Sequence, residues 1–230
     1  MSEATAKKND SSLPVWVVDD DDVRLSLRFA LATHNFNAMT FASGEDFLSQ
    51  VDPKQPGCAV LDLTMPGLSG LQIQERLMAA GSPISVIMLS AHATIHEAVH
   101  AMEMGAVSFL EKPVDPDELA RKVRIALKRS MQAWQHAQLR DLLNTLSRRE
   151  AQIFRMICQG LKNADMAERL FLSKRTVEVH REHIAHKLGY RAPISLLYEL
   201  VRETEYGELI EERATKSSPE NLGDDELDAH

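Results

Sequence analysis

Short apolar runs alternate with amphipathic stretches along the first half of the chain. Each apolar run has the length and the flanking turn signals of a buried strand. Between the runs, residues such as Val23, Leu27 and Leu31 recur at helical spacing. Five strands that alternate with five helices predict a parallel, doubly wound α/β sheet. The expected strands are 15–18, 38–41, 58–61, 84–89 and 107–110.

The second half of the chain, from Leu146 onward, has helical periodicity only. Ser147 and Glu150 form a capping-box pattern that opens a helix, and Asn163 is expected to cap the next one. Ser173 then opens a helix over residues 174–188. Two short helices joined by a tight turn predict an all-α helix-turn-helix domain.

These patterns divide the chain into four segments. The α/β domain spans residues 13–130, and the helix-turn-helix domain spans residues 146–203. Residues 131–145 form either a linker or an extension of the preceding helix, which is expected over 115–131. Residues 204–230 form an acidic tail that is expected to be disordered.

Charge is distributed unevenly among these segments. Residues 13–130 hold 10 basic and 15 acidic side chains, a net charge of −5, whereas residues 146–202 hold 11 basic and 6 acidic ones, a net charge of +5. A basic helical domain is typical of nucleic-acid binding.

Cys58 and Cys158 lie in different segments and are expected to be reduced, and no apolar run approaches 18 residues. We therefore expect a soluble cytoplasmic protein without a membrane segment.

Polar side chains stand at the ends of the predicted strands. Asp19 and Asp20 follow the first strand, Asp62 ends the third, and Ser90 and Lys112 follow the fourth and fifth. Because parallel strands share one carboxyl edge, these side chains should meet there. Three close carboxylates repel one another by roughly 3–4 kcal/mol per pair at an effective dielectric constant near 20. A Mg²⁺ ion would remove that repulsion, and a phosphoryl group on Asp62 could interact with Lys112 and Ser90. The Lys112–Pro113 bond is a candidate cis peptide.

Residues 13–130 resemble the receiver domain of response regulators. The resemblance depends on Val18-Asp19-Asp20, Leu61-Asp62 with Met65-Pro66-Gly67 and Gly70, Ser90, Phe109, and Lys112-Pro113. It implies that a partner sensor histidine kinase phosphorylates Asp62, with Mg²⁺ held by Asp19, Asp20 and Asp62. It also implies that Ser90 and Phe109 form a switch pair. The first loop is one residue shorter than usual, so the acidic pair is either Asp19 and Asp20, which strand register favours, or Asp20 and Asp21.

Residues 146–200 resemble the LuxR-type (FixJ/NarL) DNA-binding domain. The strings Leu-Ser-Arg-Arg-Glu, Gly-Leu-Lys-Asn, Thr-Val-Glu-Val-His and Lys-Leu-Gly carry the resemblance. It implies that the helix over 174–188 enters the major groove of double-stranded DNA and that residues 193–202 form a dimerising helix. Val177, Ile184 and Leu188 should face the core. The candidate DNA-contacting residues are Lys174, Arg175, Thr176, Glu178, Val179, His180, Arg181, His183 and Lys187.

We therefore predict a DNA-binding response regulator rather than an enzyme. Phosphorylation at Asp62 would promote homodimerisation and control transcription, where RNA polymerase is a further possible partner. An aspartate-dependent phosphatase is the competing class, but it needs a second aspartate as general acid where this chain has Thr64. A DNA-binding protein with a degenerate receiver is a third class, and no element of the site is missing.

Overall fold

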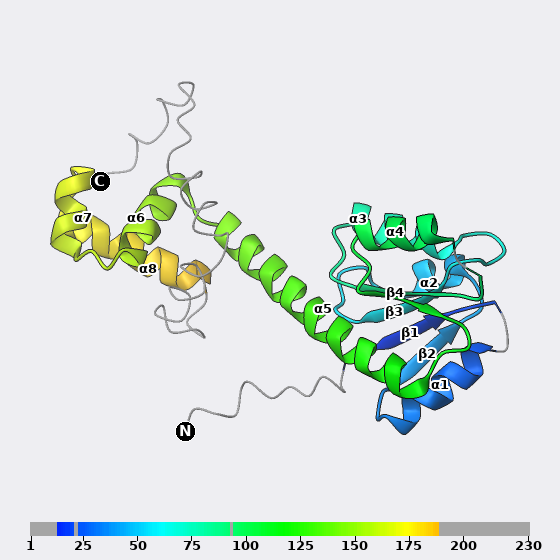
Figure 1. Ribbon diagram of the computed structural model, residues 1–230. Coiled ribbons are helices and arrows are strands. Elements are labelled where there is room, and N and C mark those ends of the chain that lie inside the picture. The colour runs from blue at the N-terminus through cyan, green and yellow to red at the C-terminus, as the bar shows by residue number, and fades with distance from the viewer. Residues whose placement is uncertain (1–12, 21–22, 93, 189–230) are drawn as a thin grey trace. The chain divides into compact units, whose positions relative to one another are not determined.

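The computed structural model of the protein describes residues 13–20, 23–92 and 94–188 (Figure 1). The chain divides into two compact units between Ala137 and Gln138, and each unit is described by itself. The first unit alternates strands and helices, and the second is helical. The elements of the first unit are β1 Val15–Val18, α1 Val23–Thr33, β2 Ala38–Phe41, α2 Gly44–Gln50, β3 Cys58–Asp62, α3 Gly70–Ala79, β4 Ser85–Ser90, α4 Ile95–Glu103, β5 Ser108–Glu111 and the start of α5 Pro116–Asn144.

The five strands form one parallel sheet in the order β2-β1-β3-β4-β5. Each residue of β3 and β4 is buried, because helices cover both faces of the sheet. Val18 pairs with Leu61, and Asp62 pairs with Leu89. The register therefore brings the carboxyl ends of β1, β3 and β4 to one edge, and the predicted α/β fold is confirmed.

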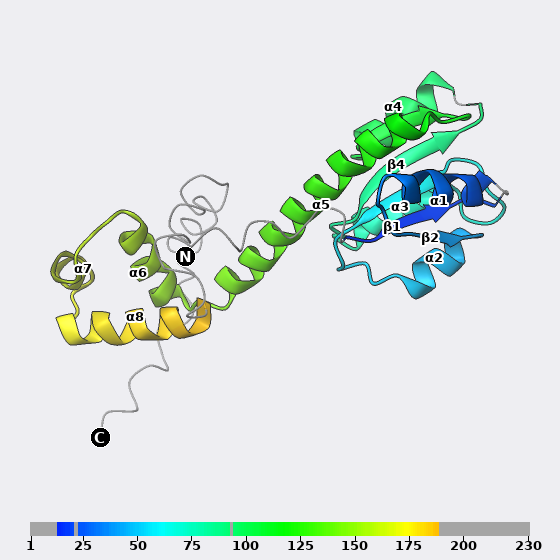
Figure 2. The ribbon, with the colours of Figure 1, turned by 90° about the horizontal axis from the view of Figure 1, so that it is seen from below.

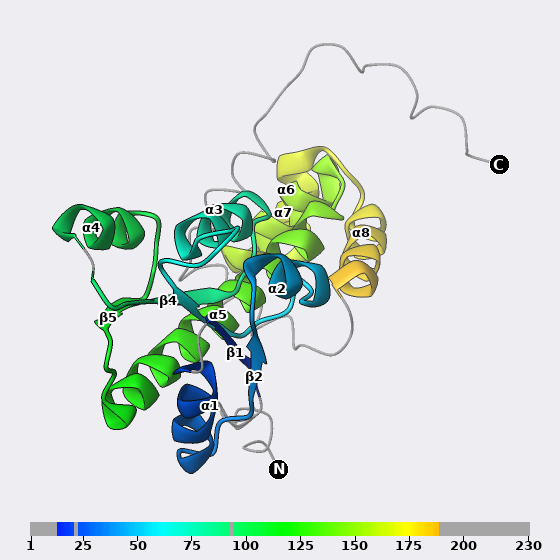
Figure 3. The ribbon, with the colours of Figure 1, turned by 90° about the vertical axis from the view of Figure 1, so that its right-hand side faces the viewer.

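Two helical layers sandwich the sheet. Helices α1 and α5 lie on one face, and α2, α3 and α4 lie on the other (Figures 1 and 3). Figure 2 views the first of these faces, with α1 and α5 in front of the strands. Each layer encloses its own core: Leu27, Leu31 and Leu119 belong to the α1/α5 side, and Phe47 and Ile73 belong to the other. Alternate residues of each strand thus serve different cores.

Trp16 on β1 is the largest side chain of the second core, and it is 1% exposed. Its indole meets Phe47 edge-on, with ring centroids 6.0 Å apart. A β-carbon added at Gly57 would lie 2.4 Å from the indole ring, so only glycine fits where β3 begins. The packing of Trp16 is therefore fixed by the Phe47 side chain of α2 and by the absence of a side chain at Gly57, just before β3.

Helix α5 continues thirteen residues beyond its expected end at Met131 and stops at Asn144. The segment from Gln132 to Asn144 contains neither glycine nor proline, so nothing in its local chemistry ends the helix earlier. Of the two alternatives that the sequence left open for this segment, a linker and an extension of the helix, the structure has the extension. Strands β4 and β5 each begin and end one residue later than expected, at Ser85–Ser90 and Ser108–Glu111.

The second unit contains α6 Arg148–Cys158, α7 Asn163–Leu170 and α8 Lys174–Leu188. The capping box of Ser147 and Glu150 is confirmed, but the expected cap by Asn163 is wrong: Lys162 is the N-cap residue of α7 and makes no side-chain cap bond. Asn163 instead accepts a hydrogen bond from Arg181. The helix-turn-helix prediction is confirmed, and α8 has the expected bounds.

Three expectations fall on residues outside those that the structure describes: a ligand role for Asp21, the dimerising helix over 193–202 and the acidic tail over 204–230. Both cysteines are free, as expected. Burial raises the pKa of Cys58 far above its usual range and that of Cys158 to about 12, so both thiols stay protonated. Among the described helices, none is long and apolar enough to cross a bilayer.

Candidate functional site

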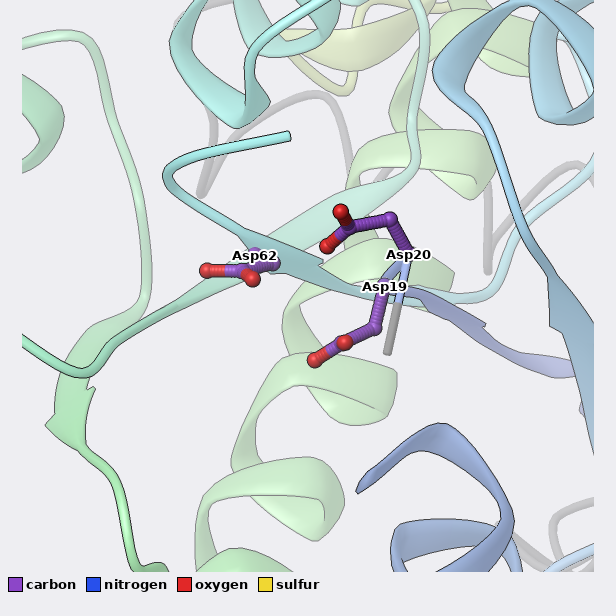
Figure 4. Close-up of side chains that lie close together, drawn as sticks. All are labelled: Asp19, Asp20 and Asp62. Atoms are coloured by element: carbon purple, nitrogen blue, oxygen red, sulfur yellow. The ribbon is translucent and has the colours of Figure 1, made fainter. Parts of the chain in front are cut away.

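An acidic pocket lies at the carboxyl edge of the sheet. Asp19 and Asp20 follow β1 and Asp62 ends β3, and one oxygen of each carboxylate lies within 4.8 Å of the others. Asp19 and Asp62 are buried, whereas Asp20 is exposed. Figure 4 shows the three side chains leaving two neighbouring strand ends toward the same region. Within the described chain, no other group of three or more such side chains gathers this closely.

Lys112, which follows β5, is the cation of this pocket. Its Nζ lies 2.7 Å from Asp19 Oδ2 and donates a hydrogen bond of 2.8 Å to Asp62 Oδ2. Burial acts to lower the pKa of Lys112, but the hydrogen bonds and the charges of Asp19 and Asp62 outweigh burial and raise that pKa above its usual value. The lysine is therefore charged at neutral pH and neutralises part of the acidic cluster. The Lys112–Pro113 bond is cis, which confirms that prediction.

The loop after β3 surrounds Asp62 closely. The backbone N–H of Thr64 donates a hydrogen bond of 3.3 Å to Asp62 Oδ1, while the Thr64 side chain is exposed. A β-carbon at Gly70 would lie 2.4 Å from the carbonyl oxygen of Asp62, so glycine is needed where α3 begins. One Asp62 oxygen is thus held by an amide and the other by an ammonium, which fixes the orientation of the carboxylate.

The two predicted switch residues lie on one face of the sheet. Met88 of β4 pairs with Phe109 of β5. Ser90 lies two residues beyond Met88, so its side chain is on the same face of the sheet as that of Phe109 on the adjacent strand. Ser90 is 2% exposed, and its Oγ accepts a hydrogen bond of 3.2 Å from the N–H of His92. Phe109 is half-buried against the core on the α3/α4 side. Their switching role stays a prediction.

The donor set of the pocket fits Mg²⁺. Three carboxylates and one ammonium carry a formal charge of −2, and all three candidate ligands offer oxygen atoms. The exposed Asp20 leaves the pocket open to an entering hydrated ion. Arg24, which the sequence reasoning missed, donates a hydrogen bond of 3.2 Å from Nη1 to the carbonyl oxygen of Asp19. The sequence does offer a signal for this contact, because Arg24 lies only four residues after Asp20, about one helical turn.

The second candidate site is the outer surface of α8. Val177, Ile184 and Leu188 are buried, which confirms the predicted inner face. The N-terminal turn is capped by Ser173, whose Oγ accepts a hydrogen bond of 3.0 Å from the N–H of Thr176. The candidate DNA-contacting residues divide by exposure: Lys174, Arg175, Glu178, His183 and Lys187 are exposed, and Thr176, Val179, His180 and Arg181 are half-buried.

Two of these candidates also hold the domain together. Lys187 Nζ lies 2.7 Å from Glu150 Oε2 and donates a hydrogen bond of 3.2 Å to the carbonyl oxygen of Thr145. Arg181 Nη1 donates a hydrogen bond of 3.1 Å to Asn163 Oδ1. These contacts bind α8 to the starts of α6 and α7. Burial lowers the pKa of His180, so this imidazole is mostly neutral at neutral pH.

Comparison with known families matches both units. Residues 15–124 match the family described as "Response regulator receiver domain", and residues 144–196 match "Bacterial regulatory proteins, luxR family". The two matched segments contain the acidic pocket and α8, respectively.

Relatives match more than three quarters of the chain. It is 39% identical to the transcriptional regulatory protein FixJ of Azorhizobium caulinodans over 182 residues, which cover 77% of this chain and 86% of the relative. It is 35% identical to the response regulator protein TmoT of Ectopseudomonas mendocina, with 86% and 90% of the two chains covered.

Solved structures give the same result. The structure of the response regulator StyR matches with a TM-score of 0.63 and 36% identity, and the match covers 83% of this chain and 98% of the StyR chain. Full-length FixJ from B. japonicum has a TM-score of 0.51 and 32% identity, and covers 84% and 97%. The chain therefore belongs to the response regulators that join a receiver domain to a LuxR-type DNA-binding domain, and it is a DNA-binding regulator of transcription.

Proposed function

We propose that Asp62 is the phosphoacceptor of this regulator and that a partner sensor histidine kinase supplies the phosphoryl group. The observation that carries the proposal is the position of Lys112 Nζ, 2.8 Å from one Asp62 oxygen at the carboxyl edge of the sheet. The Lys112 ammonium pairs with the carboxylate before transfer, and it can pair with an oxygen of the attached phosphoryl group afterwards.

The transfer conserves atoms and charge. An Asp62 carboxylate oxygen attacks the phosphorus of a phosphohistidine, the new O–P bond forms, and the P–N bond breaks. The electron pair of the broken P–N bond stays on the histidine nitrogen, which takes up a proton from water. The Thr64 N–H and the Lys112 ammonium hold the carboxylate in place for that attack.

Asp19, Asp20 and Asp62 would hold Mg²⁺ in the acidic pocket. The bound ion would neutralise the charge that gathers on the phosphoryl oxygens. We take Asp19 and Asp20 as the metal pair because both carboxylates approach Asp62.

The proposed output is a change in the population of two states. The Ser90 hydroxyl moves from the N–H of His92 toward the phosphoryl group, Phe109 turns inward, and the regulator forms a homodimer. The dimer presents two copies of α8 to two half-sites of double-stranded DNA, where it acts on RNA polymerase. Lys174, Arg175, Glu178 and His183 are the exposed side chains proposed to contact DNA, with the half-buried Thr176, Val179, His180 and Arg181 beside them and Lys187 at the far end.

Phosphorylation by acetyl phosphate and Mg²⁺ tests the acceptor. The wild-type protein should gain one acid-stable, base-labile phosphoryl group, and Asp62→Asn should gain none. Asp52→Asn, which changes an exposed aspartate outside the pocket, is the matched control and should label normally. Labelling of Asp62→Asn would refute the assignment. Steady release of phosphate from many phosphate esters by the wild-type protein would instead favour the phosphatase, although Thr64 offers no acid for that chemistry.

A further inference from the structure

The turn between α7 and α8 carries an exposed aromatic ring (Figure 1). Phe171 follows α7 directly and is 95% exposed, the largest exposed fraction of any large apolar side chain that the structure describes. Phe154, the other phenylalanine of the second unit, is fully buried in the core of that unit. The Phe171 ring therefore contributes almost nothing to the packing of its own domain.

The backbone holds this exposed residue in an unfavourable conformation. Phe171 has φ of 54° and ψ of 42°, the left-handed region that L-residues rarely adopt and that glycine enters without steric cost. The N–H of the next residue, Leu172, donates a hydrogen bond of 2.9 Å to the carbonyl oxygen of Ala167, which holds the turn in this conformation. Residues held in such conformations cluster at binding and catalytic sites, so Phe171 is a candidate for an interaction.

The position of Phe171 in the domain indicates its partner. Phe171 lies two residues before Ser173, which caps the first turn of α8. When a helix-turn-helix docks on DNA, the start of the second helix contacts base edges and the first helix crosses the sugar-phosphate backbone. The turn that joins the two helices therefore lies beside the duplex. Three exposed cations flank Phe171 along the chain, and their charges would attract the nearby phosphates: Arg169, Lys174 and Arg175.

We propose that the Phe171 ring is a specificity-determining contact with double-stranded DNA and packs against the methyl group of a thymine at one end of each half-site. A phenyl ring has no hydrogen-bonding atom, and the thymine methyl is the apolar group that base edges present in the major groove. The contact would favour thymine over cytosine, which lacks that methyl. This inference rests on the proposed role of α8 as the helix that reads DNA, and it adds an uncharged, apolar contact to the charged and polar ones of that helix.

DNA binding by the full-length protein tests the contact. The probe is a duplex that the wild-type protein selects from a pool of randomised sequences, so that its half-sites are known. Phe171→Ala and Phe171→Gly should each bind this duplex roughly tenfold more weakly, because each loses the burial of the ring. Phe29→Ala, which removes an exposed ring of the receiver domain, is the matched control and should bind like the wild type.

Three further measurements distinguish a base contact from a folding defect. Thermal unfolding should show Phe171→Gly to be at least as stable as the wild type, so that its weaker binding does not come from unfolding. Because a phenyl ring carries no charge, the slope of log affinity against log salt concentration should be the same in Phe171→Ala and the wild type. Replacing each thymine in turn by uracil should weaken wild-type binding about fourfold at one position of each half-site, where a buried methyl is lost. The same replacement should not weaken Phe171→Ala further, because the ring is already gone.

The proposal is overturned if Phe171→Ala and Phe171→Gly bind the duplex like the wild type, as they would if the ring met RNA polymerase or a second copy of the chain instead. It is also overturned if no uracil position distinguishes the wild type from Phe171→Ala. Failure of the reading role of α8 gives a different result, because Arg175→Gln would then also bind like the wild type. If only the Phe171 contact is wrong, Arg175→Gln still binds more weakly. Phosphorylation of Asp62 is measured without DNA, so its outcome is separate from both.

Discussion

Asp20 is the one carboxylate of the acidic pocket that is exposed, and the pocket carries a formal charge of −2 after Lys112 is counted. Removing the charge of Asp20 relieves repulsion from Asp19 and Asp62, which is worth about 1 kcal/mol per pair at 4 Å in a water-like dielectric. We expect Asp20→Asn to raise the Tm of the receiver domain by a few degrees in buffer without divalent cations.

Added Mg²⁺ should abolish that difference, because the wild-type protein gains stability from the bound ion and the variant binds it weakly. Thermal unfolding with and without Mg²⁺ measures both effects. Glu75→Gln, which neutralises an exposed carboxylate in the middle of α3, is the control and should respond to Mg²⁺ like the wild type. A variant that is stabilised equally in both buffers would contradict a metal site at Asp20.

Phe171 joins α7 to α8 in the left-handed conformation, with φ of 54°, and its side chain is 95% exposed. For an L-residue this conformation costs about 1–2 kcal/mol, while glycine loses about 0.5–1 kcal/mol more backbone entropy on folding. Because the exposed ring contributes little burial, Phe171→Gly should stabilise the DNA-binding domain by about 0.5–1 kcal/mol.

Phe171→Ala is the matched control for that change. It removes the ring but keeps the β-carbon, so the conformational cost remains and no stabilisation should follow. Hydrogen exchange of the α7 and α8 amides, followed over a range of denaturant concentrations, measures the free energy of unfolding of both variants. Destabilisation by Phe171→Gly would show that the ring, rather than the backbone, matters at this turn.

At the scale of elements, the Glu150–Lys187 ion pair connects the last turn of α8 to the start of α6. Burial acts to raise the pKa of Glu150, but hydrogen bonds from Lys187 and from the N–H of Ser147 outweigh it and lower that pKa below 4.5. A lowered carboxyl pKa contributes stability above the unfolded-state value, and this contribution is lost as the pH falls through the folded-state value.

We therefore expect protection of the α8 amides against hydrogen exchange to weaken as the pH falls below about 4.5. Glu150→Gln should remove this pH dependence, and Lys187→Met should destabilise the domain by roughly 2–4 kcal/mol, because it leaves a buried carboxylate unpaired. Glu168→Gln, on the exposed side of α7, should behave like the wild type. Equal pH dependence in Glu150→Gln and the wild type would contradict this assignment.

The elements that local chemistry defines were predictable from the sequence. The run from Cys58 to Asp62 is wholly apolar before its carboxylate, and Ser173 caps α8 where expected. Contacts between distant residues were not: the partner of Lys187 lies 37 positions away, and Arg181 meets Asn163 across the helix-turn-helix. A basic helix face looks the same in sequence whether its cations face DNA or hold the domain together, because only packing distinguishes the two.

At the scale of the whole molecule, a basic DNA-binding domain belongs to a chain with a formal net charge of −8. DNA affinity should therefore depend on phosphate contacts from a small set of cations and fall steeply with salt, with a log–log slope of about −0.9 for each contact. Arg175→Gln should reduce the magnitude of that slope by about one if its side chain, exposed on the first turn of α8, contacts a phosphate.

Binding measured over a range of salt concentrations gives the slope. Arg76→Gln, which removes an exposed cation of the receiver domain, should leave it unchanged. A wild-type slope near zero would contradict DNA binding through α8, and an unchanged slope in Arg175→Gln would exclude that residue as a phosphate contact.

The packing of Trp16 has a practical consequence. The chain has two tryptophans, Trp16 and Trp134, and both belong to the first unit, which ends at Ala137. Trp16 is enclosed by Phe47 and by the bare backbone at Gly57, so its emission should shift to longer wavelength only when water enters the receiver core. Tryptophan fluorescence excited near 295 nm thus follows the first unit without a label, because the second unit contains tyrosines but no tryptophan.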